Sequence, residues 1–310
     1  MIALVTGAAG FLGSHLTDRL LNEGYEVIGI DNLISGSLDN LAHLKNNKRF
    51  RFSVGDVRKS MNFKVGMVFN FACPASPVCY QKYPIPTFNT SVMGAQNLIK
   101  LARKSKCKII QASTSEVYGD PLVHPQAENY WGNVNPVGPR ACYDEGKRAA
   151  ETFLTDAKRT FNIDARIIRI FNTYGSRMKP DDGRVVSSFI TQALNNNPIT
   201  IHGHGKQSRS FCYVDDLIDG IMRIAIMDQP TGPINLGNPQ EITIKDLAVK
   251  IIQLTNSQSE IVYQQRPEDD PQTRCPDITK AMKTVGFVPK VSLDDGLLQT
   301  IGYFKNILDK

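Results

Sequence analysis

The sequence predicts an α/β protein with a doubly wound parallel sheet and a smaller lobe towards the C-terminus. Short apolar runs alternate with stretches of helical periodicity through the first half of the chain. A glycine-rich turn joins the first apolar run to the first helix, and loops rich in glycine and proline appear after residue 171. We therefore expect a Rossmann-like domain followed by a C-terminal substrate-binding lobe.

The first expected strand, residues 2–6, has no polar alternation, which is typical of a strand buried in a parallel sheet. Gly7, Gly10 and Gly13 follow it with the spacing G-x-x-G-x-x-G. Glycines at these positions allow a tight turn and the close approach of a pyrophosphate to the N-terminus of the next helix. That helix is expected to end at Gly24, and its apolar face carries Leu12, Leu16 and Leu20.

An acid at the end of the second expected strand, residues 26–30, completes a dinucleotide-binding pattern. Asp31 lies 18 residues after Gly13, where a carboxylate can accept hydrogen bonds from the hydroxyls of the adenosine ribose. Its charge repels a 2′-phosphate, so we expect NAD rather than NADP. Asp56, after the third strand, could reach the adenine amine. The expected cofactor contacts are Gly7, Gly10, Phe11, Leu12, Gly13, Asp31, Asn32, Asp56, Val57, Ala72, Thr90, Tyr143 and Lys147.

The alternation of strands and helices continues to residue 171. Further strands are expected at 51–54, 67–72, 108–112 and 164–171, and helices at 87–104 and around Tyr143. Later in the chain we expect loops at 174–183 and 198–205, a strand leading into a helix after Arg209, a strand at 233–237, and helices at 244–255 and 292–307. The predicted division is an NAD-binding domain, 1–171 with roughly 209–237, and a substrate-binding lobe, 172–208 with 238–310.

Composition excludes several classes of protein. The chain has 310 residues, of which 41% are hydrophobic and 21% charged, as in an ordinary globular protein. No apolar run approaches the ~20 residues needed to span a bilayer, and the N-terminus has no basic segment, so we expect a cytoplasmic protein without a signal peptide or anchor. Six scattered cysteines form no C-x-x-C pair, which favours reduced thiols and no metal site.

Charge favours a small anionic ligand over a polymer. The net charge of +6 suits an anionic substrate. The basic group at 103–108 has no interleaved aromatic residue and the one at 45–51 has Phe50 alone, so we expect neither a nucleic-acid partner nor a membrane surface.

Tyr143 and Lys147 are four residues apart in an expected helix, so their side chains share one face. A phenol titrates near ~10 and is a poor base at neutral pH. A lysine ammonium and a cationic nicotinamide ring beside it would both stabilise the phenolate. The pair is therefore a candidate for proton transfer, although the same spacing also occurs by chance on solvated helices.

Polar residues follow the strand at 108–112, at the edge where ligands bind in doubly wound folds. Thr114 can hydrogen-bond a sugar hydroxyl while Tyr143 removes its proton. Ser115 and Glu116 add a second hydroxyl and a carboxylate, which suits acid–base work on a neighbouring carbon. Simple turn formation is the alternative for the hydroxyl residues.

The chain resembles the extended short-chain dehydrogenases/reductases that act on nucleotide sugars, and more narrowly the UDP-glucuronate decarboxylases, or UDP-xylose synthases. Besides GAAGFLGSHL at 7–16, the matching runs are ACPASP (72–77), STSEVYGDPLVHPQAENYWGNVNPVGPRACYDEGKRAAE (113–151), RIFNTYGSRM (169–178), DDGRVVSSFI (181–190), INLGNP (234–239) and DDPQTRCPD (269–277).

The resemblance implies bound NAD and a complete reaction. Tyr143 would take the proton of the sugar C4 hydroxyl, carbon dioxide would leave from the resulting 4-keto acid, and Ser115 and Glu116 would manage protonation at C5. The implied substrate contacts are Pro74, Ser76, Asn172, Arg184, Val185, Arg209 and Arg274. The family also implies a homodimer through a four-helix interface built from 87–104 and 143–161.

Two positions depart from the family pattern, and other activities stay open. His202 stands where the family usually has tyrosine, and Asn89 where it tends to have lysine. The alternatives are a decarboxylase that releases the 4-keto pentose with NADH, a nucleotide-sugar 4-epimerase and a 4,6-dehydratase. A non-catalytic NAD sensor on the same fold is a further alternative, but it has no need for Tyr143, Lys147, Thr114 and Glu116 together.

Overall fold

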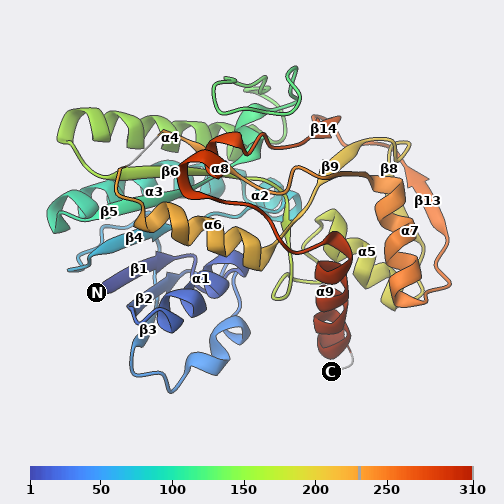
Figure 1. Cartoon of the computed structure of the whole chain (residues 1–310), viewed down its shortest axis with the longest axis horizontal. Coiled ribbons are helices and arrows are strands. Elements are labelled where there is room, and N and C mark those ends of the chain that lie inside the picture. The colour runs from blue at the N-terminus through green and yellow to red at the C-terminus, as the bar shows by residue number, and fades with distance from the viewer. Residues whose placement is uncertain (230–231, 309–310) are drawn as a thin grey trace.

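The computed structural model describes residues 1–229 and 232–308. A parallel sheet lies at the centre of the larger part of the molecule (Figure 1). Its strand order is β11-β6-β5-β4-β1-β2-β3. The strands are β1 (Ile2–Thr6), β2 (Glu26–Asp31), β3 (Phe50–Val54), β4 (Met67–Asn70), β5 (Lys108–Thr114), β6 (Ala165–Ile170) and β11 (Ile234–Leu236). All pairings among them are parallel. The predicted doubly wound sheet is confirmed.

Helices cover both faces of this sheet because successive strand residues point in opposite directions. Ala3 and Val5 of β1 pack towards α1 (Phe11–Asn22) and α6 (Val214–Ile226). Leu4 belongs to the opposite core, beneath α3 (Pro84–Ser105) and α4 (Ala141–Phe161). The apolar strands therefore lack polar alternation because both of their faces are buried.

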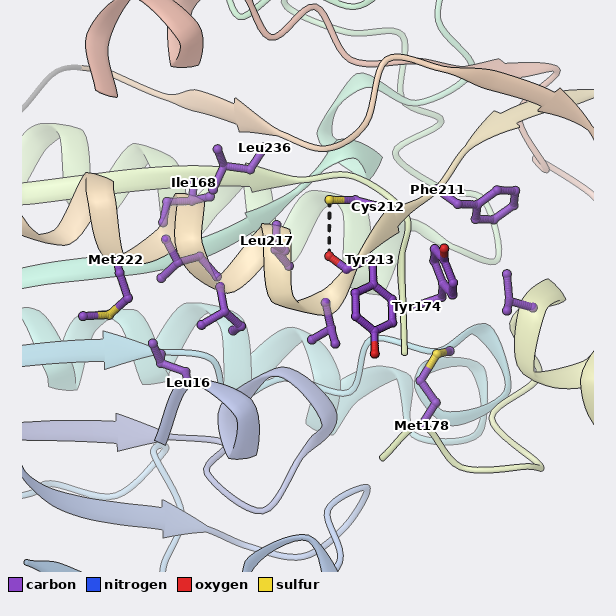
Figure 2. Packing of buried hydrophobic residues seen from close by; sticks show 14 of the residues in the cluster. Leu16, Ile168, Tyr174, Met178, Phe211, Cys212, Tyr213, Leu217, Met222 and Leu236 are labelled. Atoms are coloured by element: carbon purple, nitrogen blue, oxygen red, sulfur yellow. Dashed lines mark hydrogen bonds between the residues drawn. The ribbon is translucent and has the colours of Figure 1, made fainter. Parts of the chain in front are cut away.

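The smaller lobe shares the hydrophobic core that lies between the sheet and helices α1 and α6. Figure 2 shows the buried cluster continuing from Leu16 and Ile168 to Phe211 and Met178. The lobe contains α5 (Val185–Leu194), α7 (Ile244–Thr255), α9 (Leu293–Leu308), the pair β8 (Ile199–His202) and β13 (Ile261–Gln264), and the sheet β12 (Glu241–Thr243), β9 (Ser208–Ser210) and β14 (Thr273–Arg274). Figure 1 shows α5, α7 and α9 grouped beyond the end of the large sheet.

Shorter elements connect these parts. They are the strands β7 (Thr173–Tyr174) and β10 (Cys212–Tyr213), which pair with each other, the helices α2 (Pro77–Lys82) and α8 (Thr279–Val285), and the 3-10 helices η1 (Leu38–Leu44) and η2 (Ser115–Tyr118). None of the helices in the described ranges is long and apolar enough to cross a membrane.

The prediction of a loop at 198–205 is wrong, because that segment contains β8. Ile199 and Ile201 are buried while Thr200 and His202 between and after them are not, which is the alternation of a half-buried strand. Its partner β13 lies about sixty residues later in the chain, so the flanking proline and glycines dominated the local pattern. The fourth strand was also predicted two residues too long, since β4 ends at Asn70.

Candidate active site

A cavity of about 760 Å³ lies at the carboxyl ends of the central strands and is also lined by the smaller lobe. Most of the residues that the sequence singled out line it. They are Gly7, Gly10, Phe11, Leu12, Gly13, Asp31, Asn32, Val57, Ala72, Pro74, Ser76, Thr90, Thr114, Ser115, Glu116, Tyr143, Lys147, Asn172, Arg184, Val185 and Arg209. The side chains of Asp56 and Arg274 lie elsewhere.

The glycine turn forms a cradle with no room for side chains. A Cβ at Gly13 would lie 2.0 Å from the carbonyl oxygen of Gly7, and Gly7 itself has φ +72°. Gly10 is the N-cap residue of α1 and has no side chain to accept hydrogen bonds from the first backbone N–H groups of the helix. Gly10, Phe11 and Leu12, at this helix start, line the cavity. These features fit the pyrophosphate of a dinucleotide.

Asp31 is buried at the end of β2, where the backbone N–H groups of Ala9 and Leu33 donate to its carboxylate at 3.0 and 2.8 Å. Burial raises the pKa of Asp31, and the hydrogen bonds from Leu33 and Ala9 oppose that rise. The carboxylate is thus oriented by the turn itself, with acceptor capacity left for ribose hydroxyls.

Asp56 is not among the residues that line the cavity, although its neighbours Gly55 and Val57 are. Its carboxylate accepts two hydrogen bonds from Nε of Arg58 and one, at 2.5 Å, from Nη2. These bonds hold the pKa of Asp56 below its ordinary value. The Asp56 side chain is therefore paired with Arg58, and its contact with the adenine amine stays a prediction.

Helix α4 places Tyr143 and Lys147 one turn apart, next to Thr114 at the end of β5. The Lys147 ammonium lies 5.7 Å from the centre of the Tyr143 ring and donates to the carbonyl of Ala112 at 2.8 Å. The Thr114 hydroxyl forms a hydrogen bond with the phenol. Tyr80 stacks on the other side, with ring centres 5.2 Å apart.

Burial controls the charge of this pair. It raises the pKa of Tyr143, as does nearby Cys73, while the hydrogen bond from Thr114 lowers it. Burial also lowers the pKa of Lys147. The phenol is therefore protonated in the ligand-free chain, and it can lose a proton only when further positive charge or a strong hydrogen-bond donor enters the cavity.

Glu116 is held between two arginines. Arg140 donates to one carboxylate oxygen at 2.6 Å and Arg274 to the other at 2.7 Å. Burial would raise the pKa of Glu116, but the two guanidinium groups outweigh it and hold the pKa below its usual range. Glu116 is consequently an ionised acceptor in the ligand-free chain and carries no proton to donate at neutral pH.

The two arginines differ in access to the cavity. Arg274 is 1% exposed and also donates to Ser115 Oγ and to the carbonyl of Gly119, so it supports the site from behind. Arg140 lines the cavity, and the sequence did not single it out. The signal was present, because Arg140 precedes Tyr143 by only three residues, and the structure makes it the N-cap residue of the same helix.

Two further arginines and the two departures from the family pattern can be placed. Arg209 is tied to Asp270 and to the carbonyl of Pro271, and burial lowers its pKa. Arg184 lies over the ring of Phe11, with its guanidinium carbon 5.7 Å from the ring centre.

His202 lines the cavity, whereas Asn89 does not. Other lining residues that the sequence reasoning missed are Tyr80, Arg177, Lys179, Gln192 and Gln207.

Comparison with known proteins agrees with this geometry. Residues 3–237 match the model of the NAD dependent epimerase/dehydratase family. The chain belongs to this family. Within it, the chain is 51% identical over 298 residues to UDP-glucuronic acid decarboxylase 5 of Arabidopsis thaliana, covering 96% of this chain and 87% of the relative. UDP-glucuronic acid decarboxylase 1 of Xenopus tropicalis is 47% identical over 307 residues, covering 99% and 72%.

A solved structure from the same family has the same fold. UDP-glucuronic acid 4-epimerase from Bacillus cereus, in complex with UDP-glucuronic acid and NAD, superposes with a TM-score of 0.89 and 30% identity. The match covers 99% of this chain and 100% of the epimerase. The family fold is thus shared between enzymes with different reactions, and the choice among them depends on the site.

Proposed function

We propose that this protein is an NAD-dependent carboxy-lyase that converts UDP-glucuronate to UDP-xylose and carbon dioxide. One observation carries the proposal: Tyr143, with Thr114 and Lys147, shares a single cavity with the glycine turn and with the Glu116–Arg140 pair. The decarboxylase relatives, about half identical over nearly the whole chain, support the same reaction.

The proposed chemistry begins at C4 of the sugar. Tyr143 takes the proton of the C4 hydroxyl while Thr114 orients that oxygen. NAD, when bound in the glycine cradle, would accept the hydride from C4 and return it at the end of the cycle. Lys147 in its protonated form would lower the free energy of the phenolate beside it.

The carboxylate next to the new ketone makes the second step possible. Once C4 is a ketone, the C5 carboxylate belongs to a β-keto acid, and the electrons of the broken C–C bond delocalise into the ketone as an enolate. Ser115 and ionised Glu116 are proposed to position the proton donor for C5, and Arg140 supplies the positive charge on this side of the cavity. Arg184, Arg209 and Asn172 are proposed to contact the UDP moiety or its phosphates.

We also propose the domain division expected from the sequence, with 172–208 and 238–310 as the nucleotide-sugar-binding lobe, and a homodimer in the cytoplasm. All six cysteines are free thiols, which is typical of a reducing compartment. On α3, Ile85 is 73% exposed and Phe88 and Met93 are more than a third exposed, and Phe153 on neighbouring α4 is 37% exposed. An apolar surface on two packed helices suits a second copy of the same pair.

Incubation with UDP-glucuronate and NAD tests the reaction. Mass spectrometry should show a product that is lighter than UDP-glucuronate by the mass of carbon dioxide. NADH, followed by its absorbance, should not accumulate. An unchanged mass would indicate a 4-epimerase, and loss of water a 4,6-dehydratase. Loss of carbon dioxide with stoichiometric NADH would indicate release of the 4-keto pentose, and no conversion at all would contradict the proposal.

A further inference from the structure

Three residues far apart in the sequence meet outside the cavity. In the ranges 1–229 and 232–308, His124, Glu241 and Cys275 form the one group of metal-ligating side chains whose ligand atoms all lie within 4.8 Å of one another. None of the three lines the active-site cavity. We propose that they form a binding site for a zinc ion.

Backbone pairing fixes the three ligands independently of any metal. Glu241 begins β12, which pairs with β9, and Cys275 directly follows β14 on the other side of β9. Gln126, two residues after His124, exchanges backbone hydrogen bonds with Cys275 and Asp277, and its side chain accepts from the N–H of Cys275. The site is therefore largely preorganised, so that little chain ordering opposes binding.

The donor set selects the metal. A thiolate, an imidazole and a carboxylate together suit Zn²⁺, whereas Mg²⁺ and Ca²⁺ prefer oxygen alone. Zinc bonds of about 2.0–2.3 Å place neighbouring ligand atoms roughly 3.3–3.7 Å apart in a tetrahedral site. His124 Nε2 and Glu241 Oε2 are 2.9 Å apart, so a small opening of this pair and an approach of the thiol would satisfy that geometry.

The surroundings leave one coordination position open and support the carboxylate. The side chains of His124 and Glu241 are 42% and 29% exposed, so a water molecule can reach the fourth position. Ser208 donates its hydroxyl to Glu241 Oε1 at 2.6 Å. That hydrogen bond orients the carboxylate and leaves Oε2 directed at the imidazole, as outer partners of metal ligands commonly do.

The position of Cys275 connects this site to the active site. Cys275 follows Arg274, whose guanidinium holds Glu116 and Ser115. A metal that joins Cys275 to β12 and His124 would fix the short strand carrying Arg274 against its neighbours. Binding should therefore stabilise the folded chain in proportion to the zinc concentration.

Metal binding by the purified protein tests the proposal. We expect one zinc ion per chain by equilibrium dialysis, and a thiolate-to-cobalt charge-transfer band when Co²⁺ is used as the probe. Cys275→Ser should abolish that band, and His124→Asn and Glu241→Gln should each weaken zinc binding by at least about tenfold. Zinc should raise the melting temperature of the parent chain but not of Cys275→Ser.

A second histidine–carboxylate pair provides a matched control. His43 Nε2 lies 2.7 Å from Asp18, with similar exposure but no cysteine in the ligand cluster. His43→Asn should leave zinc affinity and the cobalt band unchanged, as should Cys107→Ser. Zinc binding that survives Cys275→Ser unchanged, or that is lost equally in His43→Asn, would overturn the proposal, and so would the absence of a thiolate–cobalt band in the parent chain.

Discussion

At the scale of single residues, burial decides which groups near the reacting sugar can carry protons. Tyr143 and Lys147 are both shielded from water, so each is driven towards its neutral form. Glu116, whose side chain is 17% exposed, is ionised because two guanidinium groups contact it. The charges of Arg140 and Arg274 decide the protonation state of Glu116, whereas desolvation shifts the pKa values of Tyr143 and Lys147 most.

Tyr143→Phe should reduce turnover by at least about 100-fold, because the base for the C4 hydroxyl is removed. Binding of NAD should persist, since the glycine turn and Asp31 are unchanged; calorimetric titration measures this. Tyr80→Phe is the matched control, because Tyr80 stacks on Tyr143 and its buried hydroxyl has no hydrogen-bond partner in the described ranges. Comparable loss in both variants would contradict a proton-transfer role for Tyr143.

The buried carboxyl of Asp144, close to Glu116, predicts that the stability of the fold depends on pH. Burial and then the charge of Glu116 raise its pKa above the ordinary 3.8, and its Oδ1 has no hydrogen-bond partner among the described residues. A raised carboxyl pKa means that the folded chain binds this proton more tightly than the unfolded chain, so stability falls as pH rises above 3.8 towards the raised pKa. Asp144→Asn removes this loss.

The free energy of unfolding of Asp144→Asn minus that of the parent chain should therefore be more positive at about pH 9 than at about pH 5, so the variant gains stability relative to the parent as the pH rises. Urea denaturation at both pH values measures it, with the midpoint and the slope compared. A difference between the two chains that does not change with pH would show that Asp144 is ionised in the folded state.

At the scale of elements, the contact between α1 and the turn that follows β1 leaves no room for a side chain at Gly13. Gly13→Ala would put a methyl group against the Gly7 carbonyl, so the turn must open and the cradle must change shape. We expect a loss of stability of about 1–3 kcal/mol and a weakened affinity for NAD. Thermal denaturation and calorimetric titration measure the two effects.

Gly302→Ala is the control, because it makes the same substitution in a helix without a steric clash. Gly302 lies in α9 with nothing within 4 Å of an added Cβ. Alanine there should stabilise the chain by about 1 kcal/mol through helix propensity and leave NAD affinity unchanged. Equal effects of the two substitutions would contradict the steric account of the turn.

At the scale of the whole molecule, the exposed apolar side chains on α3 and α4 predict self-association. Phe88→Asp should shift the mass measured by light scattering from a dimer to a monomer, because a buried, unpaired carboxylate opposes the interface. Leu122→Asp is the control, since Leu122 is 82% exposed and lies outside both helices, in the segment between η2 and α4. A monomeric parent chain, or dissociation by Leu122→Asp alone, would contradict the proposed interface.

The amino-acid sequence by itself determined the features that depend on neighbours along the chain. The glycine spacing, Asp31 at the end of β2 and the Tyr143–Lys147 helix pair were all predictable, because turn, strand and helix periodicities are local. The bounds of β1 and α7 were predicted to the residue, since an uninterrupted apolar or amphipathic run marks each of them.

The tertiary structure alone decided contacts between distant segments. It put Arg274 behind Glu116 with Arg140 in front, and it formed β8 on β13 within an expected loop. It also brought together His124, Glu241 and Cys275, whose spacing in the chain resembles no metal motif. Such contacts depend on how elements pack across the fold, and side chains separated by more than a hundred residues leave no periodic trace in the sequence.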